Sequence, residues 1–219
     1  IRPCDPQLKN TVHLLGFRES DLCLPWREGK VHILKMLEGQ IVTEDVQEEV
    51  GYTEEKGRKV FKPDGTYQKI AAVERHKNTG KIGVGIVKGF GLRGGAIASS
   101  VSHDSHNLIV IGDNDHDMYL AVQELLRTQG GYTLVENGQV FHTLPLPIMG
   151  LMSDAGYEKV NEKLARMIPK AHEMGIPEGF DPFITLSFMA LPVIPEIRIT
   201  PRGVYLTQED RMIQSPFDR

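Results

Sequence analysis

The chain has 219 residues, enough for one large domain or for one domain and part of a second. Its 40% hydrophobic and 25% charged residues are ordinary for a soluble globular protein, and the net charge of −4 with no basic stripe argues against a nucleic-acid-binding protein. Its apolar runs are too short for a transmembrane helix, and two cysteines are too few for a disulfide framework or a zinc ribbon. We therefore expect a cytoplasmic protein that binds neither nucleic acid nor membrane.

The first residues resemble a linker. The chain begins with Ile1 instead of methionine, and residues 2–6 contain two prolines. We expect that the N-terminal part of a longer protein precedes this chain. The loss of a few residues is the alternative.

Short strands are expected over most of residues 1–50. Residues 10–15 are apolar enough for a strand, and residues 30–37 alternate more clearly between apolar and polar positions. The charged segment 45–60 is typical of a solvated surface. We place a domain boundary here, between a β segment over 1–50 and a larger domain over 51–219.

Residues 59–87 are also expected to be extended. Asp64-Gly65 between extended flanks predicts a hairpin turn, and residues 70–73 predict a buried strand. Glycines interrupt the apolar strand at 81–87. Glycine inside a strand often marks the close approach of another backbone or of a ligand.

A glycine-rich stretch follows this strand, but it fits neither common phosphate-binding motif. No Gly-Lys-Ser/Thr ends it, which excludes a P-loop. Gly89, Gly91 and Gly94 have the spacing of a dinucleotide-binding motif, but they do not lie between a strand and a helix with a suitable acid downstream. We reject a dinucleotide site.

A strand, an acidic turn and a helix are predicted next. Residues 96–102 suit a short helix or a strand, and residues 108–111 predict a strand. Residues 112–115 supply a turn and a helix N-cap, and the glycines at 130–131 end the helix. The apolar face of this helix comprises Met118, Ala121, Val122, Leu125 and Leu126. Because this face occupies the later positions of a calcium-loop pattern that begins at Asp113, we reject a calcium site.

The last third predicts two hairpins and two helical segments. Asn137-Gly138 marks the first hairpin turn, and residues 201–203 mark the second. Ser153-Asp154 is expected to cap a long amphipathic helix, and Asp181 a short apolar one. The fold class is therefore α/β or α+β, with a mixed sheet, hairpins and two or three amphipathic helices, preceded by short strands.

A polar cluster lies between the glycine-rich stretch and the strand at 108–111. Its members are Ser102, His103, Asp104, Ser105, His106 and Asn107. The histidines could carry a proton or contact a substrate, with Asp104 orienting one imidazole. A metal site would need a third ligand from elsewhere, and no Gly-x-Ser-x-Gly motif supports a hydrolase triad. A tight turn whose side chains satisfy backbone groups fits equally well.

Three long stretches resemble one known family. Residues 87–112, 144–154 and 181–196 are similar to the C-terminal domain of bacterial adenine deaminases of the amidohydrolase superfamily, and residues 38–43 fit the region just after the barrel of these enzymes. The resemblance covers essentially the whole chain. It implies the hydrolysis of adenine to hypoxanthine and ammonia by a metal-activated water, as part of purine salvage and adenine catabolism.

The resemblance also implies what this chain lacks. The family binds a pair of manganese or iron ions in a (β/α)8 barrel whose ligands include a His-x-His pair. None of the eight histidines here forms such a pair, and the chain is too short for the barrel. We expect residues 1–50 to be post-barrel strands, the metals to be bound by the missing N-terminal barrel domain, this chain alone to be inactive, and the parent enzyme to be a dimer or another homo-oligomer.

The polar cluster is where we expect chemistry. Supporting catalytic roles are assigned to His103, Asp104 and His106, and contacts with adenine to Ser102, Ser105, Asn107, Gly94 and Gly95; we expect no metal ligand in this chain. The loop would then close the active site or support the metal centre. The alternatives are a purely structural or dimerisation domain, a stand-alone purine-binding module, and an independent metallohydrolase.

Overall fold

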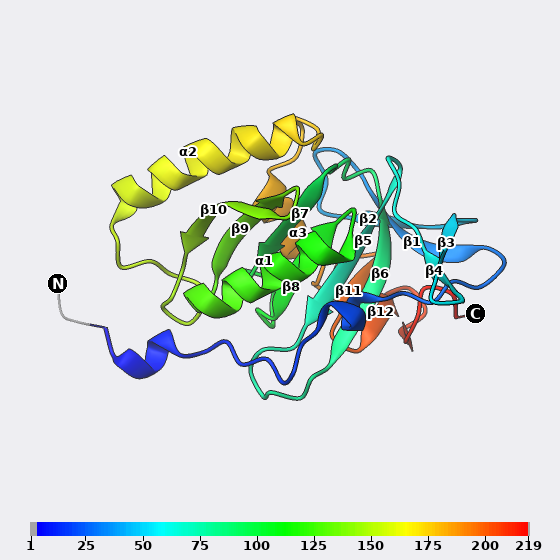
Figure 1. Cartoon of the computed structure of the whole chain (residues 1–219), viewed down its shortest axis with the longest axis horizontal. Coiled ribbons are helices and arrows are strands. Elements are labelled where there is room, and N and C mark those ends of the chain that lie inside the picture. Colours follow the sequence, from blue (N-terminus) through cyan, green and yellow to red (C-terminus); the bar gives the residue numbers. More distant parts are fainter. Residues whose placement is uncertain (1–3, 219) are drawn as a thin grey trace.

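The structure, a computed structural model, describes residues 4–218 and is built around one large sheet (Figure 1). Its strands are β1 Val31–Met36, β2 Thr43–Glu48, β3 Tyr52–Glu55, β4 Arg58–Phe61, β5 Tyr67–Val73, β6 Ile82–Lys88, β7 Gly95–Ser99, β8 Leu108–Gly112, β9 Gly131–Glu136, β10 Gln139–Pro145, β11 Ile197–Thr200, β12 Gly203–Leu206 and β13 Arg211–Ile213. Its α-helices are α1 Asp115–Thr128, α2 Tyr157–Glu173 and α3 Pro182–Phe188, with short 3-10 helices at Pro6–Lys9 and Glu19–Leu22.

The large sheet has eight strands in the order β10-β9-β7-β8-β5-β6-β1-β2. Neighbours are antiparallel except β1 and β6, which run parallel, with Leu34 opposite Val87. The strands β11, β12 and β13 form a second sheet, and β3 and β4 form a third. This arrangement confirms the α+β fold class. The expected domain division near residue 50 stays a prediction, and strands from both sides of that point share the large sheet.

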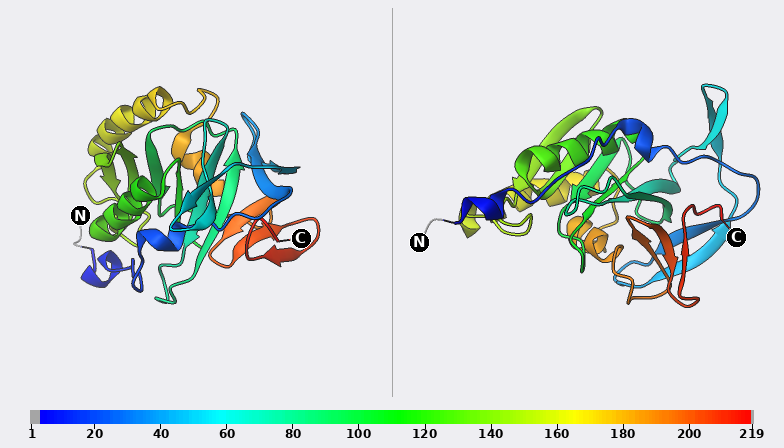
Figure 2. Two further views of the ribbon diagram at one scale, coloured as in Figure 1. Left: turned by 45° about the vertical axis from the view of Figure 1, so that its right-hand side comes forward. Right: turned by 90° about the horizontal axis from the view of Figure 1, so that it is seen from below.

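Both faces of the large sheet are buried. Figure 2 shows α1 and the N-terminal segment on one face and α3 with the β11–β13 sheet on the other. Strand β5 contributes side chains to the hydrophobic cores on both faces of the sheet. Ile70 and Ala72 belong to the core under α2 and α3. Ala71 and Val73 belong to the core under α1. Alternate residues of a strand point to opposite faces, so a segment buried on both sides, such as residues 70–73, is apolar at consecutive positions.

Strand β8, helix α1 and strand β9 form the predicted βαβ-like unit. The side chain of Asn114 caps α1 by accepting a hydrogen bond from the backbone N–H of Asp117 (2.8 Å). The helix ends at Thr128, and its C-cap Gln129 adopts a left-handed conformation just before Gly130. Strand β7 lies between β8 and β9 and is antiparallel to both, so β8 and β9 run parallel.

Several local predictions are confirmed. Asn137 and Gly138 form the turn between β9 and β10, and the carboxylate of Asp181 caps α3 by accepting from the N–H groups of Phe183 and Ile184. Residues 201–203 close the hairpin of β11 and β12. The ambiguous segment 96–102 is mainly strand β7.

The prediction of a strand at residues 10–15 is wrong. The N–H groups of Thr11 and Val12 donate to the side-chain oxygen of Gln129 (2.9 and 3.0 Å), and that of His13 donates to the carbonyl oxygen of Arg75 (3.0 Å). A side chain thus takes the place of a partner strand. Residues 1–3 of the predicted linker lie outside the described residues, and Pro6 begins a 3-10 helix.

Two further local predictions are also wrong. The turn at Asp64-Gly65 does not join a hairpin, since β4 pairs with β3 and β5 pairs with β6 and β8. The carboxylate of Asp64 instead accepts from the N–H groups of Thr66 and Tyr67. Helix α2 begins at Tyr157 with Gly156 as its N-cap, and Asp154 forms an ion pair with Lys9.

Gly83 shows why glycine interrupts β6. A Cβ atom there would lie 2.0 Å from the carbonyl oxygen of Thr200 and 2.7 Å from the nitrogen of Gly203. Both are backbone atoms of the β11–β12 turn, which therefore packs directly on β6. The expected close approach of another backbone is confirmed at this position.

We expect Gly83→Ala to lower the free energy of unfolding by about 2–3 kcal/mol, because two packed backbones must separate. Gly85→Ala is the matched control, since its Cβ would first meet the side-chain Cδ1 of Ile199, at 3.3 Å. Urea denaturation of both variants gives the two free energies. Equal losses would contradict the steric explanation.

Candidate functional site

The polar cluster forms the loop that joins β7 to β8. Ser102 is buried, Asp104 and Ser105 are exposed, and His103, His106 and Asn107 are partly buried. The backbone N–H of His103 donates to the carbonyl oxygen of Ser187 at the end of α3 (3.0 Å), and the His103 ring lies 5.0 Å from that of Phe188. The loop is thus attached to α3 on one side.

The imidazole of His106 is fixed within the loop. Its Nδ1 accepts a hydrogen bond from the backbone N–H of Ser102 (3.2 Å), and its own backbone N–H donates to the carbonyl oxygen of Ser102 (2.6 Å). Because Nδ1 is an acceptor, the proton of the neutral ring is on Nε2. Burial lowers the pKa of His106, and the neighbouring charges of His103 and Arg75 lower it further. A neutral imidazole with an Nε2–H donor follows.

Asp104 does not orient either imidazole, contrary to one expectation for this loop. Among residues 4–218 its carboxylate forms no hydrogen bond with His103 or His106, and Ser102 takes the orienting role for His106. Asn107 is also engaged locally: its Nδ2 donates to Ser105 Oγ (3.1 Å), and its Oδ1 accepts from the backbone N–H of Arg75 (3.2 Å). The tight turn expected as an alternative is therefore part of the site.

Arg75 anchors the loop through its guanidinium, a role that no local sequence pattern predicts. Arg75 is 1% exposed, and its guanidinium donates to the carbonyl oxygens of His106 (2.5 Å), Thr11 (2.8 Å) and Met149 (2.9 Å). Burial lowers its pKa to about 10. A cation bonded to three carbonyl oxygens ties the loop to the N-terminal segment and to the turn near Met149.

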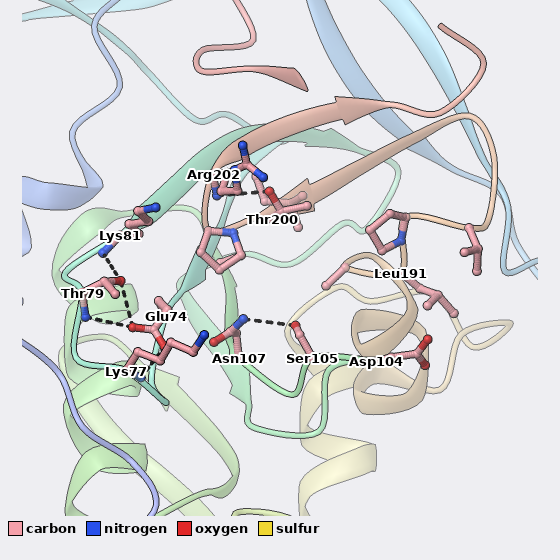
Figure 3. Close-up of a pocket in the computed structure, with 16 residues that line it drawn as sticks. Glu74, Lys77, Thr79, Lys81, Asp104, Ser105, Asn107, Leu191, Thr200 and Arg202 are labelled. Atoms are coloured by element: carbon pink, nitrogen blue, oxygen red, sulfur yellow. Dashed lines mark hydrogen bonds between the residues drawn. The ribbon is translucent and has the colours of Figure 1, made fainter. Parts of the chain in front are cut away.

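The loop borders a cavity of about 510 Å³, a size typical of small-molecule sites. Asp104, Ser105 and Asn107 contribute one side of it, as Figure 3 shows. The remaining walls come from the turn between β5 and β6, the segment after α3, and the β11–β12 turn. Most of the lining is apolar, with polar groups from the loop at its margin.

The turn between β5 and β6 is organised by Glu74. Its carboxylate accepts hydrogen bonds from the backbone N–H groups of His76 (2.6 Å), Lys77 (2.7 Å) and Thr79 (2.9 Å), and from the hydroxyl of Thr79 (2.9 Å). Partial burial alone raises the pKa of Glu74, but these hydrogen bonds outweigh it and lower the pKa to about 2. The ionised carboxylate therefore shapes one wall of the cavity.

We expect Glu74→Gln to lower the free energy of unfolding by about 1–2 kcal/mol at pH 7, since one amide oxygen cannot serve four donors. Because the pKa of Glu74 is lowered from 4.5 to about 2 on folding, its contribution is present above pH 4.5 and is lost as the pH falls to 2. Denaturation curves between pH 2 and pH 7 test this. Glu54→Gln, at an exposed carboxylate, is the control, and a pH-independent difference at Glu74 would contradict it.

Gly94 and Gly95 do not lie with the loop. They are at the opposite end of the β7–β8 pair, where Ala96 faces Gly112, and their N–H groups donate to the carboxylate of Asp113 (2.5 and 3.1 Å). Ser102 does lie in the loop, but its hydroxyl is buried and has no hydrogen-bond partner among the described residues. The structure thus brings together only part of the expected substrate-binding set.

No three His, Cys, Asp or Glu side chains among residues 4–218 come together as a metal-binding group. The described residues therefore do not fit a pair of manganese or iron ions, and we assign no reaction step in this chain to a metal. No helix in the same part of the chain is long and apolar enough to cross a membrane.

Comparison with known proteins identifies the family that this chain resembles. The family model described as "Adenine deaminase C-terminal domain" matches residues 40–211. Adenine deaminase of Desulfitobacterium hafniense (strain Y51) is 50% identical over 214 residues, which are 98% of this chain and 37% of that protein. Adenine deaminase of Bacillus subtilis (strain 168) is 44% identical over 205 residues, 92% of this chain and 35% of that protein. The chain spans about a third of the length of these curated relatives.

Proposed function

We propose a function for this chain from one premise: it belongs to the adenine deaminase C-terminal domain family. We infer that it is the C-terminal part of an enzyme that hydrolyses adenine with one water to hypoxanthine and ammonia. The names of its relatives support the reaction, and the family match over residues 40–211 supports the position in the protein. The preceding part would hold the adenine-binding site and any manganese or iron.

The loop of residues 102–107 carries the proposal. It borders a cavity of about 510 Å³ through Asp104, Ser105 and Asn107. Within the loop, the imidazole of His106 is held neutral with Nε2 as a donor. Adenine has ring nitrogens that accept hydrogen bonds, so an Nε2–H donor suits it. We propose that the loop closes over adenine bound by the preceding part of the protein, and that His103 and His106 contact the substrate.

The test is the rate of ammonia release from adenine by the longer protein. We expect His103→Ala and His106→Ala each to lower kcat/KM about 100-fold, the scale of a positioned donor or proton carrier. His116→Ala is the matched control, because His116 is an exposed residue of α1 that pairs with Glu19. The isolated chain is expected to release no ammonia with manganese or ferrous iron added.

Each alternative gives a different result. Loss of thermal stability without loss of specific activity in the loop variants would indicate a purely structural role. Full activity in both histidine variants would refute the proposed closure of the site. Robust ammonia release by the isolated chain would mean that it binds its own metal.

A further inference from the structure

Apolar side chains continue from α3 to the cavity beside the loop. Val193 lines the cavity and is 80% exposed, and Leu191 and Pro192 lie next to it in the same wall. On α3, Ile184 is 54% exposed and lies four residues before Phe188, whose ring contacts His103. Residues four apart share one face of a helix. Exposed apolar residues grouped around a functional loop are typical of a surface that another protein covers.

Positive side chains lie at one end of this surface. Lys77, Lys81 and Arg202 line the cavity, and none has a carboxylate within ion-pair distance among the described residues. The nearby carboxylate of Glu74 is occupied by the four donors of its own turn. In Figure 3 the three cations lie on the side of the cavity away from Asp104. The chain as a whole carries a net charge of −4, so these cations differ from the average surface.

We propose that this surface docks against the preceding part of the same longer protein, through an apolar projection flanked by carboxylates. We call it the loop face and define it by Ile184, Phe188, residues 191–193, the loop at 102–107 and the cations Lys77, Lys81 and Arg202. The inference rests on the proposed function, because the loop that would close over adenine lies within the loop face. About two-thirds of the length of the relatives lies outside this chain, which is ample for a domain that covers it.

A second copy of this chain fits the loop face less well. An isologous dimer places the same patch on both sides, so each copy would bring three cations and only the exposed carboxylate of Asp104 to pair with them. Carboxylates on the preceding domain would pair with Lys77, Lys81 and Arg202 instead. Like charges opposed across an interface cost affinity, and opposite charges favour it.

The experiment is hydrogen exchange on the longer protein, comparing Val193→Asp with the unaltered sequence. Val193 is 80% exposed here, so this chain tolerates aspartate there, but an interface that buries it does not. We expect the amides of residues 102–107 and 185–194 to exchange at least about tenfold faster, a loss of about 1.4 kcal/mol of local protection. Val140→Asp is the matched control, because Val140 is 41% exposed on the edge strand β10.

A second variant tests the role of the positive charges in the same hydrogen-exchange experiment. Lys77→Glu combined with Lys81→Glu is expected to speed exchange at the same amides, with a smaller effect at high salt. Unchanged exchange in Val193→Asp would overturn the proposal. The proposal would also be overturned if light scattering gave the Val193→Asp protein half the molecular mass of the unaltered protein. The loop face would then join two copies of the protein.

The hydrogen-exchange and activity measurements test the interface and the role of the loop independently. If Val193→Asp opens the loop face but His103→Ala and His106→Ala keep full activity, the interface stands and the proposed role of the loop fails. If the histidine variants lose activity while exchange at the loop face is unchanged in Val193→Asp, the interface is refuted and the role of the loop stands.

Discussion

Replacing Arg75 with methionine is expected to lower the free energy of unfolding by about 3–5 kcal/mol and to loosen the loop at 102–107. Arg75 is 1% exposed, and its guanidinium donates to the carbonyl oxygens of Thr11, His106 and Met149. Methionine fills part of the volume but leaves those buried oxygens without donors. Urea denaturation measures the loss. Arg75→Lys keeps the charge with fewer donors, so its free energy of unfolding is expected to lie between those of the unaltered protein and Arg75→Met.

Arg198 provides the control. Arg198 is 0% exposed. Like that of Arg75, its guanidinium has no carboxylate partner among the described residues; it donates to Thr43 Oγ1 and to the carbonyl oxygens of Ile41, Pro195 and Ile197. Burial lowers its pKa to about 10 as well. Arg198→Met should therefore cost similar stability but leave the loop unchanged.

The pKa of the His106 imidazole distinguishes a loss of stability from a change in the loop. Its pKa is lowered first by burial and then by the charges of His103 and Arg75. In Arg75→Met one of these charges is absent, so an NMR titration should show a higher pKa for His106. In Arg198→Met the pKa should not move. An unchanged titration in Arg75→Met would mean that Arg75 stabilises the fold without positioning the loop.

Asp115→Ala is expected to lower the free energy of unfolding by about 3–5 kcal/mol, because it leaves a buried ammonium without its partner. The side chain of Lys69 on β5 is 3% exposed and pairs with Asp115 in the first turn of α1. Removing both charges, in Lys69→Met with Asp115→Ala, should restore most of the loss. A double-mutant cycle by urea denaturation measures the coupling, and additive losses would contradict a coupled pair.

The parts of the fold that could be predicted are those with local signals. The sequence predicts strand β8 and helix α1 because an apolar run, a capping turn at residues 112–115 and an apolar helix face lie within twenty residues of one another. The turn at Asn137-Gly138 was predicted for the same reason. These signals depend only on the backbone preferences of neighbouring residues, which a single sequence contains.

The missed features depend on partners far away in the sequence. Residues 10–15 have the composition of a strand, but their N–H groups meet the side chain of Gln129, more than a hundred residues later. Arg75 lies in a polar Glu-Arg-His segment and has the appearance of a surface residue. Its burial is decided by Thr11 and Met149, which no local pattern connects to it.

The candidate site was predicted in part. The loop at 102–107 was identified from its residue types, and the structure places Asp104, Ser105 and Asn107 at a cavity. Gly94 and Gly95 were grouped with it because they are close in sequence. Gly95 begins the five-residue strand β7, and the loop follows the other end of that strand, so residues that are close in sequence lie far apart in space.

The parallel pairing of β1 with β6 has a consequence for shortening the chain. A version that starts at residue 51 would lack β1 and β2, so β6 would become the outermost strand of the large sheet. Its unpaired backbone N–H and C=O groups would then be a template for the strands of other molecules. Such a shortened chain is expected to self-associate, and any minimal version intended for solution work should retain the sequence from Val31 onward.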